Sequence, residues 1–123
     1  MTTNGSGFNL GDDPNNGYWM VAANPQDDVV VRHSSQPGWD TLVGGKTKAT
    51  PAMVVDDAGV PTIFVRGLDD RVHRARRVGG QWSTFGEWAP ETILGAPGVY
   101  RNRQGIVRVY AAMADQRIFF RAV

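Results

Sequence analysis

The chain of 123 residues contains no cysteine, no long apolar run and no excess of either charge. The absence of cysteine excludes disulfide bonds, a thiolate nucleophile and a cysteine-ligated metal. No segment approaches the roughly 20 consecutive apolar residues of a transmembrane helix, and the first thirteen residues form neither a basic leader nor an apolar stretch. The sequence therefore predicts no signal peptide and no membrane insertion, which leaves a cytoplasmic location or export without a leader open.

The charges are nearly balanced, with 13 basic and 12 acidic residues. The most basic segment is RVHRARR at 71–77, and the alternation of a β-strand would send its charges to opposite faces. Nucleic-acid binding usually requires a basic domain whose charges gather on one face. The sequence therefore predicts no nucleic-acid partner and a solvated, charged rim instead.

The chain nearly repeats itself. Residues 51–75 return without a gap as residues 97–121, an offset of 97 − 51 = 46 residues, and a weaker copy at 17–33 overlays 59–75 at 59 − 17 = 42. The positions identical at the larger offset are Pro51/Pro97, Gly59/Gly105, Asp69/Asp115 and Arg71/Arg117. A period of this length indicates stacked structural modules. The approximate modules are 9–45, 46–90 and 91–123.

Each module is typical of short strands separated by turns. In the middle copy the expected strands are 52–55, 62–66, 71–76 and 81–88. The second of these carries apolar residues on both faces, with Ile63 and Val65 on one side and Phe64 on the other. Four antiparallel strands covered on both faces indicate a β-propeller blade. We therefore predict an all-β fold of about three four-stranded blades, the last of which lacks its fourth strand.

Three such blades cannot close a ring by themselves. The missing strand would leave an unpaired edge, which invites association with another copy. The sequence therefore predicts a homo-oligomer, with six blades from a dimer favoured. Whether the Gly- and Asn-rich N-terminal segment 2–8 supplies the missing strand is left open.

Three segments resemble the repeat of the PLL-like bacterial β-propeller lectins, and more distantly tachylectin-type propellers. They are GWDTLVGG at 38–45, ATPAMVVDDAG at 49–59 and IFVRGLDDRVHRA at 63–75. The Arg-Gly pair at 66–67 is replaced by Asn-Pro at 24–25 in the first copy and by Ala-Met at 112–113 in the third. The resemblance implies a non-catalytic, multivalent lectin that binds fucose-like or related terminal monosaccharides between blades.

In such sites an aromatic ring stacks on the apolar face of a sugar while polar side chains bind its hydroxyls. The expected stacking residues are Trp39, Trp82 and Trp88, and the expected donors are Arg66, Arg74 and Arg101. The structural alternative for each tryptophan is packing between blades. The functional alternative is a non-lectin propeller that acts as an assembly scaffold or protein-interaction module, and this chain could be a fragment or engineered piece of a longer one.

Other chemistry is not expected. Neither His33 nor His73 has a nearby serine, cysteine or histidine whose spacing suggests catalytic geometry, and His73 is expected in the core between blades. Asp69, and Asp27 in the first copy, are expected to cap hairpin turns through backbone amides. The GDDPNNG loop at 11–17 overlays such turns and lacks the ligand spacing of a calcium loop. We therefore predict no enzyme activity, no metal and no cofactor.

Overall fold

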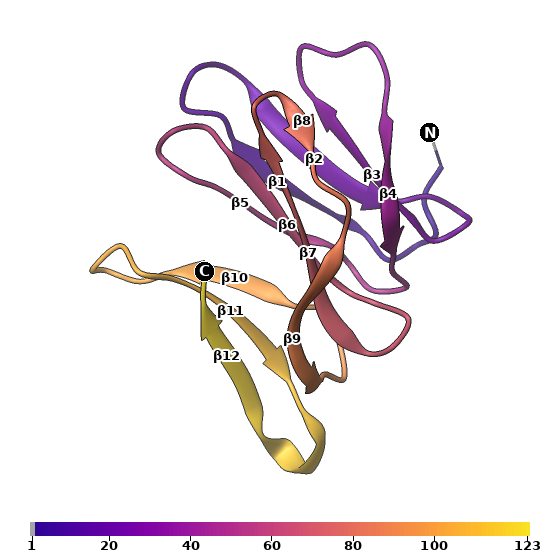
Figure 1. Ribbon diagram of the computed structural model, residues 1–123, viewed down its shortest axis with the longest axis vertical. Coiled ribbons are helices and arrows are strands. Elements are labelled where there is room, and N and C mark those ends of the chain that lie inside the picture. The colour runs from indigo at the N-terminus through magenta and orange to yellow at the C-terminus, as the bar shows by residue number, and fades with distance from the viewer. Residues whose placement is uncertain (1) are drawn as a thin grey trace.

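The computed structural model describes residues 2–123, which form three antiparallel sheets and no α-helix (Figure 1). Sheet 1 contains β1 (Phe8–Asp12), β2 (Tyr18–Ala23), β3 (Asp28–His33) and β4 (Asp40–Lys46). Sheet 2 contains β5 (Ala52–Val55), β6 (Pro61–Arg66), β7 (Arg71–Val78), β8 (Gln81–Trp82) and β9 (Gly86–Thr92). Sheet 3 contains β10 (Gly98–Arg101), β11 (Val107–Ala112) and β12 (Ile118–Ala122), with the 3₁₀ turn η1 (Ala114–Gln116) before its last strand.

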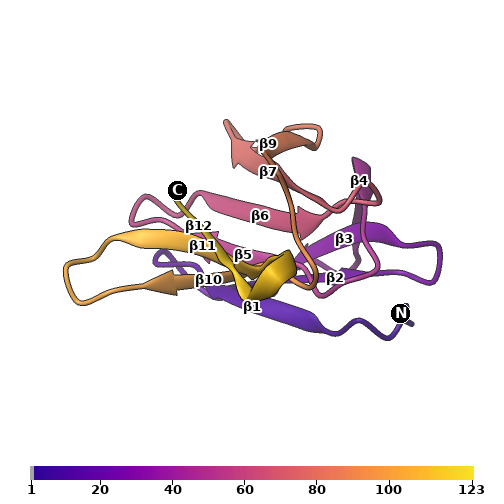
Figure 2. The same cartoon turned by 90° about the horizontal axis from the view of Figure 1, so that it is seen from below.

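The all-β, antiparallel prediction is confirmed. Successive strands pair with one another through hairpins, and sheet 2 lies between sheets 1 and 3 (Figure 1). The N- and C-terminal ends lie apart in both views (Figures 1 and 2). Within residues 2–123 there is no helix with the length and apolar character needed to cross a membrane.

Both faces of sheet 2 are buried, as the apolar pattern of its second strand predicts. Ile63 and Val65 belong to a cluster shared with Trp19, Val21, Val29, Val31 and Leu42 of sheet 1. Phe64 points the other way, into a cluster shared with Val109, Ala111 and Phe119 of sheet 3. All three β6 side chains are fully buried. Because strand residues alternate between faces, the apolar residues of this one strand pack into two interfaces.

The fourth strand of sheet 2 is interrupted, whereas the sequence predicts a continuous strand over 81–88. The Ser83 amide donates to the Arg76 carbonyl, and the Arg76 amide donates to Ser83 Oγ. The side chain of Ser83 thus takes the place of a backbone acceptor, so regular pairing stops after Trp82 and resumes at Gly86. The result is β8 and β9 with an irregular segment between them.

Sheet 3 has three strands, so β12 is an edge strand. The N-terminal segment is bound elsewhere within the same chain. The Asn4 amide donates to the Ala23 carbonyl, and the Asn4 side chain donates to Asp27 Oδ1 and to the Thr47 carbonyl. At Asn4 the segment is therefore attached to sheet 1 and not to β12.

The hairpins between first and second strands define the true offset of the repeat. The Asp56 amide donates to the Val60 carbonyl in sheet 2, and the Asp13 amide donates to the Gly17 carbonyl in sheet 1. The offset is therefore 56 − 13 = 43 residues, and the value of 42 taken from the sequence is wrong. The equivalent bond in sheet 3 starts at Asn102, at the predicted offset of 102 − 56 = 46.

This difference of one residue decides which way each side chain of sheet 1 points, because strand residues alternate between faces. At an offset of 43, Val21 and Val29 correspond to Phe64 and Val72. All four face the following sheet. The corrected register therefore makes sheets 1 and 2 equivalent in packing as well as in topology.

The turns between second and third strands also repeat. At the equivalent position each holds a non-glycine residue in the left-handed region, Asp27 at φ 65°, Asp70 at φ 65° and Gln116 at φ 61°, and the third turn holds a second one, Asp115 at φ 60°. Asp69 caps its turn as predicted, because its carboxylate accepts the Arg71 amide. Asp27 does not play that part. Its carboxylate accepts the Asn4 side chain, and Asn24 Oδ1 accepts the local amides instead.

His73 is not in the core, contrary to the sequence prediction. Its side chain keeps 24% of its surface exposed, and its Nε2 lies 2.9 Å from Asp69 Oδ1. Burial raises the pKa of the Asp69 carboxyl, but the Arg71 amide and His73 outweigh it, so this pKa lies below its usual value. The imidazole lies on β7, which pairs with both β6 and β9, and it is held beside Asp69 at a position where sheet 3 has the buried Phe119.

The pKa values of two further carboxyl groups are lowered in the folded protein, and this makes its stability depend on pH. The Lys46 ammonium, 2.6 Å away, lowers the pKa of Asp28, and the Asn15 amide lowers that of Asp13. A carboxyl group whose pKa is lower in the folded state than in the unfolded state, where it is near 3.8, stabilises the fold above that pH. This stability is lost as the pH falls through the folded-state pKa. We expect the urea concentration at the unfolding midpoint to decrease when the pH is lowered below about 4. An Asp28→Asn variant should show a smaller fall, and an identical pH profile in the variant would contradict this.

Candidate functional site

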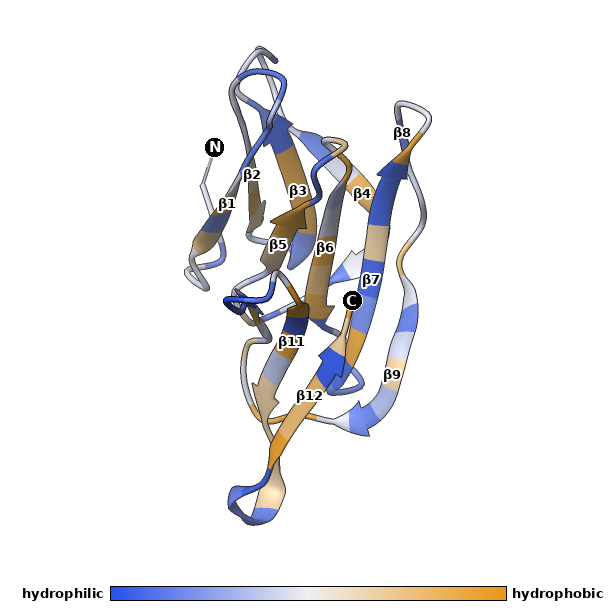
Figure 3. Ribbon diagram, turned by 90° about the vertical axis from the view of Figure 1, so that its left-hand side faces the viewer, coloured by the Kyte–Doolittle hydropathy of each residue, from blue (hydrophilic) through white to orange (hydrophobic). Residues whose placement is uncertain are grey.

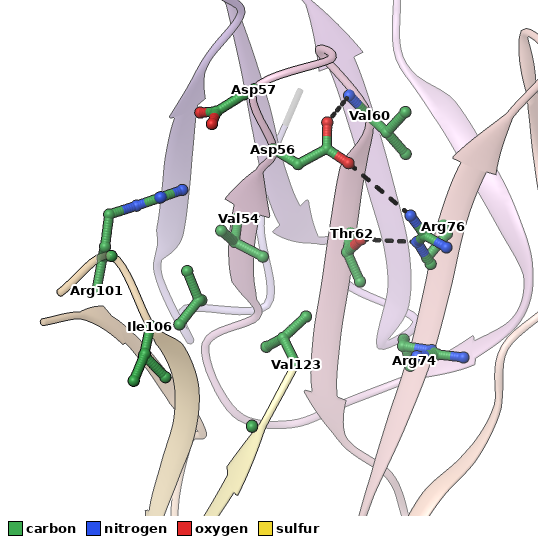
Figure 4. A pocket seen from close by; sticks show the side chains of 13 residues that line it. Val54, Asp56, Asp57, Val60, Thr62, Arg74, Arg76, Arg101, Ile106 and Val123 are labelled. Carbon is green, nitrogen blue, oxygen red and sulfur yellow. Dashed lines mark hydrogen bonds and ion pairs between the residues drawn. The ribbon is translucent and has the colours of Figure 1, made fainter.

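A pocket of about 560 Å³ lies between sheets 2 and 3, and we call it the inter-sheet pocket (Figure 4). Sheet 2 and its first hairpin contribute Val54, Asp56, Asp57, Val60, Thr62, Arg74 and Arg76. Sheet 3 and its end contribute Arg101, Gly105, Ile106, Val107, Ala122 and Val123. The pocket therefore combines charged side chains with an aliphatic lining.

The inter-sheet pocket lies where sheet 2 has a small residue at the position that a tryptophan occupies in sheet 1. Thr62 is the counterpart of Trp19 at the offset of 43. Trp19 fills the junction between sheets 1 and 2, where only 5% of its surface is exposed. Its ring lies 5.8 Å from that of Trp82 and 5.2 Å from the Arg77 guanidinium. The smaller Thr62 leaves this volume free at the next junction, and sheet 3 has no fourth strand to cover it.

The polar groups of the pocket alternate between donors and acceptors. The Asp56 carboxylate accepts the amides of Ala58 and Val60, which fixes it on the hairpin. Arg76 Nε donates to Thr62 Oγ1 at 3.3 Å, and its guanidinium lies 3.9 Å from Asp56 (Figure 4). Arg101 faces them from the wall formed by sheet 3 (Figure 4). Such a surface can bind neutral groups that both donate and accept hydrogen bonds.

A second pocket, of about 540 Å³, lies where the fourth strand of sheet 2 is interrupted. We call it the tryptophan pocket because Trp82 and Trp88 both line it. Its other lining residues are Arg74, Arg76, Val78, Gln81, Ser83, Thr84, Gly86 and Glu87. Arg74 and Arg76 line both pockets, since their side chains form the ridge on β7 that separates them.

Packing contacts hold the two tryptophans in place. Trp82 contacts Trp19 of sheet 1, whereas the Trp88 ring lies 4.9 Å from Phe64 and 6.4 Å from Phe119. The Arg121 guanidinium lies 4.7 Å from the centre of the Trp88 ring. Both residues are half-buried, so each stabilises an interface and also contributes surface to the tryptophan pocket.

The structure brings together four of the six residues expected at a ligand site. Trp82, Trp88 and Arg74 meet in the tryptophan pocket, and Arg74 also lines the inter-sheet pocket with Arg101. Arg66 lies at the opposite end of β6, 2.9 Å from Asp70. Trp39 lies on the outer face of sheet 1, in a small separate pocket.

Sequence reasoning missed several lining residues, namely Asp56, Asp57, Thr62 and Glu87. Arg76 could be placed beside Arg74, because the two are two residues apart on a strand and so share a face. The role of Thr62 is recognised only when this residue is aligned with Trp19, and that alignment requires the repeat offset of 43 residues.

His33 contacts one residue that is distant in the sequence and one residue of its own turn. Its Nε2 lies 3.1 Å from Asp13 Oδ2, and its Nδ1 lies 2.7 Å from Ser35 Oγ. The Ser35 amide also donates to the same Nδ1, so this nitrogen takes part in a local turn. None of the pockets described above is lined by Ser35. Within residues 2–123 no cluster of histidine, aspartate and glutamate could hold a metal ion.

Comparisons with known proteins give a likeness of fold only. No model of a protein family matches the sequence, and no curated protein matches it. Among solved structures, the chain is similar to a fucose lectin from Kordia zhangzhouensis in complex with methyl-fucoside. The match has a TM-score of 0.57 at 12% sequence identity, and it covers 95% of this chain and 92% of that one.

Proposed function

We propose that this chain is a non-catalytic carbohydrate-binding protein whose principal ligand site is the inter-sheet pocket. The observation that carries the proposal is the lining of that pocket, where arginine donors and aspartate acceptors surround an aliphatic surface. The fold is similar to that of a solved fucose lectin, and the repeat resembles that of propeller lectins. These two likenesses favour fucose-like or related terminal monosaccharides.

The chemistry of a monosaccharide suits this lining. Neighbouring hydroxyls can donate to the carboxylates of Asp56 and Asp57 and accept from the guanidinium of Arg101. The C–H face of a sugar, or a methyl group, can pack on Val54 and Ile106. A longer glycan would pass the Arg74–Arg76 ridge and reach the tryptophan pocket, where an indole provides a flat apolar surface.

We further propose that the three sheets are consecutive blades of a β-propeller, corresponding to modules 9–45, 46–90 and 91–123. A ring of six blades from two chains would then carry several copies of the site. Affinity at a single site is expected to be weak, in the millimolar to micromolar range. Repetition around a ring raises the effective affinity for a surface that displays many glycans.

A glycan array, followed by calorimetric titration, tests this proposal. We expect binding to a defined group of saccharides, with methyl-fucoside as the first soluble probe. Arg74→Ala should weaken binding at least about tenfold, because hydrogen bonds from a charged donor contribute about 1.5–3 kcal/mol. Arg117→Ala is the matched control, since it removes an exposed arginine that lines none of the pockets described above.

A blank array from a correctly folded protein would contradict the proposal. It would favour the alternative of an assembly scaffold or protein-interaction module. If Arg74→Ala and Arg117→Ala reduce the array signal equally, the ligand site lies elsewhere on the surface.

A further inference from the structure

The two outer faces of the three-sheet stack remain uncovered and are rich in large apolar side chains. On sheet 3, Ile118 and Phe120 keep 69% and 61% of their surface exposed, and β12 is largely orange in the hydropathy view (Figure 3). Tyr110 stacks on Phe120 there, with ring centres 6.1 Å apart. On sheet 1, Phe8 and Leu10 are 56% and 52% exposed. Exposed apolar surface of this kind marks an interaction face.

The repeat itself indicates what covers these faces. At the offset of 46, Tyr110 and Ile118 of sheet 3 correspond to Phe64 and Val72, which face the following sheet. At the offset of 43, Leu10 of sheet 1 corresponds to Met53, which faces the preceding sheet. In sheet 2 both faces are buried by a neighbouring sheet of the same chain. Each outer face is therefore one half of an interface that this chain already forms twice.

The charges at the rim are complementary in the same register. Within the chain, Asp57 of sheet 2 and Arg101 of sheet 3 both line the inter-sheet pocket, from its two walls. The counterpart of Asp57 on sheet 3 is Arg103, and the counterpart of Arg101 on sheet 1 is Asp12. Both signs are reversed, so the two outer faces carry opposite charges at this position, as the inner faces do.

We propose that the outer face of sheet 3 packs on the outer face of sheet 1 of a second copy, with Arg103 beside Asp12 of that copy. This inference rests on the propeller arrangement proposed above and adds the faces, the register and the charge pair that join the chains. It also assigns a role to Trp39, whose counterpart Trp82 contacts Trp19. The counterpart of Trp19 on sheet 3 is Arg108, so Trp39 lies against Arg108 of the second copy.

The first test is the mass of the protein in solution at micromolar concentration, measured by sedimentation equilibrium. The wild type should have twice the mass of one chain. Phe120→Asp should be a monomer, because it places a charge where Val31, its counterpart on sheet 1, is fully buried in the junction with sheet 2. Leu68→Asp is the matched control: Leu68 is also 61% exposed but lies in a turn away from both outer faces, so this variant should remain a dimer.

The second test is a charge exchange. Asp12→Arg and Arg103→Asp should each raise the dissociation constant of the dimer, roughly fivefold or more, since each places like charges together at both junctions. The double variant should restore the wild-type value. A wild-type monomer would overturn the proposed junction, as would a dimer that is indifferent to both single changes or is not restored by the double variant.

Saccharide binding is measured separately in the Phe120→Asp monomer. The inter-sheet pocket lies within one chain, so this monomer should still bind the saccharide at each site. A dimer with the expected charge dependence but without any saccharide binding would overturn the proposed function and leave the junction supported. A monomeric wild type that binds saccharide would overturn the proposed junction and leave the proposed function supported.

Discussion

A Thr62→Trp variant is expected to fold like the wild type and to lose measurable saccharide binding. The indole would occupy the inter-sheet pocket in the way that Trp19 occupies the equivalent junction between sheets 1 and 2. Calorimetric titration with a saccharide that binds the wild type measures the effect. Binding should fall by at least about a hundredfold, because the ligand would have to displace a packed aromatic side chain.

Thr62→Val is the control for this variant. It removes the hydroxyl that accepts from Arg76 but keeps the pocket open, so only a small loss of affinity is expected. Far-UV circular dichroism and the unfolding midpoint confirm that both variants are folded. If Thr62→Trp is folded and binds like the wild type, the ligand does not enter the inter-sheet pocket.

Phe64→Ala is expected to destabilise the chain by about 3–5 kcal/mol, the usual cost of removing a buried phenylalanine ring. Phe64 is fully buried between sheets 2 and 3, where it contacts Trp88. Because small domains are stable by only about 5–15 kcal/mol, much of the variant could unfold at room temperature. Urea unfolding followed by tryptophan fluorescence measures the change.

The matched control is Leu68→Ala, which truncates a large apolar side chain that is exposed in a turn. Its free energy of unfolding should stay within about 0.5 kcal/mol of the wild-type value. A loss below about 1 kcal/mol in Phe64→Ala would mean that the junction between sheets 2 and 3 contributes little to the fold. That result would contradict the packing described above.

The fold was largely predictable because the second and third copies share their turns. Gly59 and Gly105 have the same offset as the strands around them, and both adopt a positive φ, at 84° and 81°. The first copy was harder to align. Gly17 also has a positive φ, at 78°, but occupies the next position of its turn, so matching it to Gly59 shifts the strand by one residue. Only the pairing of backbone groups reveals the shift.

The candidate site was predictable only in part. Trp82, Trp88 and Arg74 could be grouped because they lie on neighbouring strands of one module. The open volume beside Thr62 could not be predicted, since it depends on how side chains of two sheets pack against one another. Arg66 could not be separated from that group by sequence alone, and it lies at the other end of β6 beside Asp70, four residues away across a tight turn.

The ligand site is tested most directly by backbone amide NMR. Uniformly ¹⁵N-labelled wild-type protein is titrated with the saccharide that gives the strongest array signal, and the amide shifts are mapped onto the three sheets. The proposal predicts that the largest shifts gather at residues 54–62, 74–76 and 101–107, around the inter-sheet pocket. Shifts confined to the outer face of sheet 1, or no saturable shifts at millimolar ligand, would contradict it.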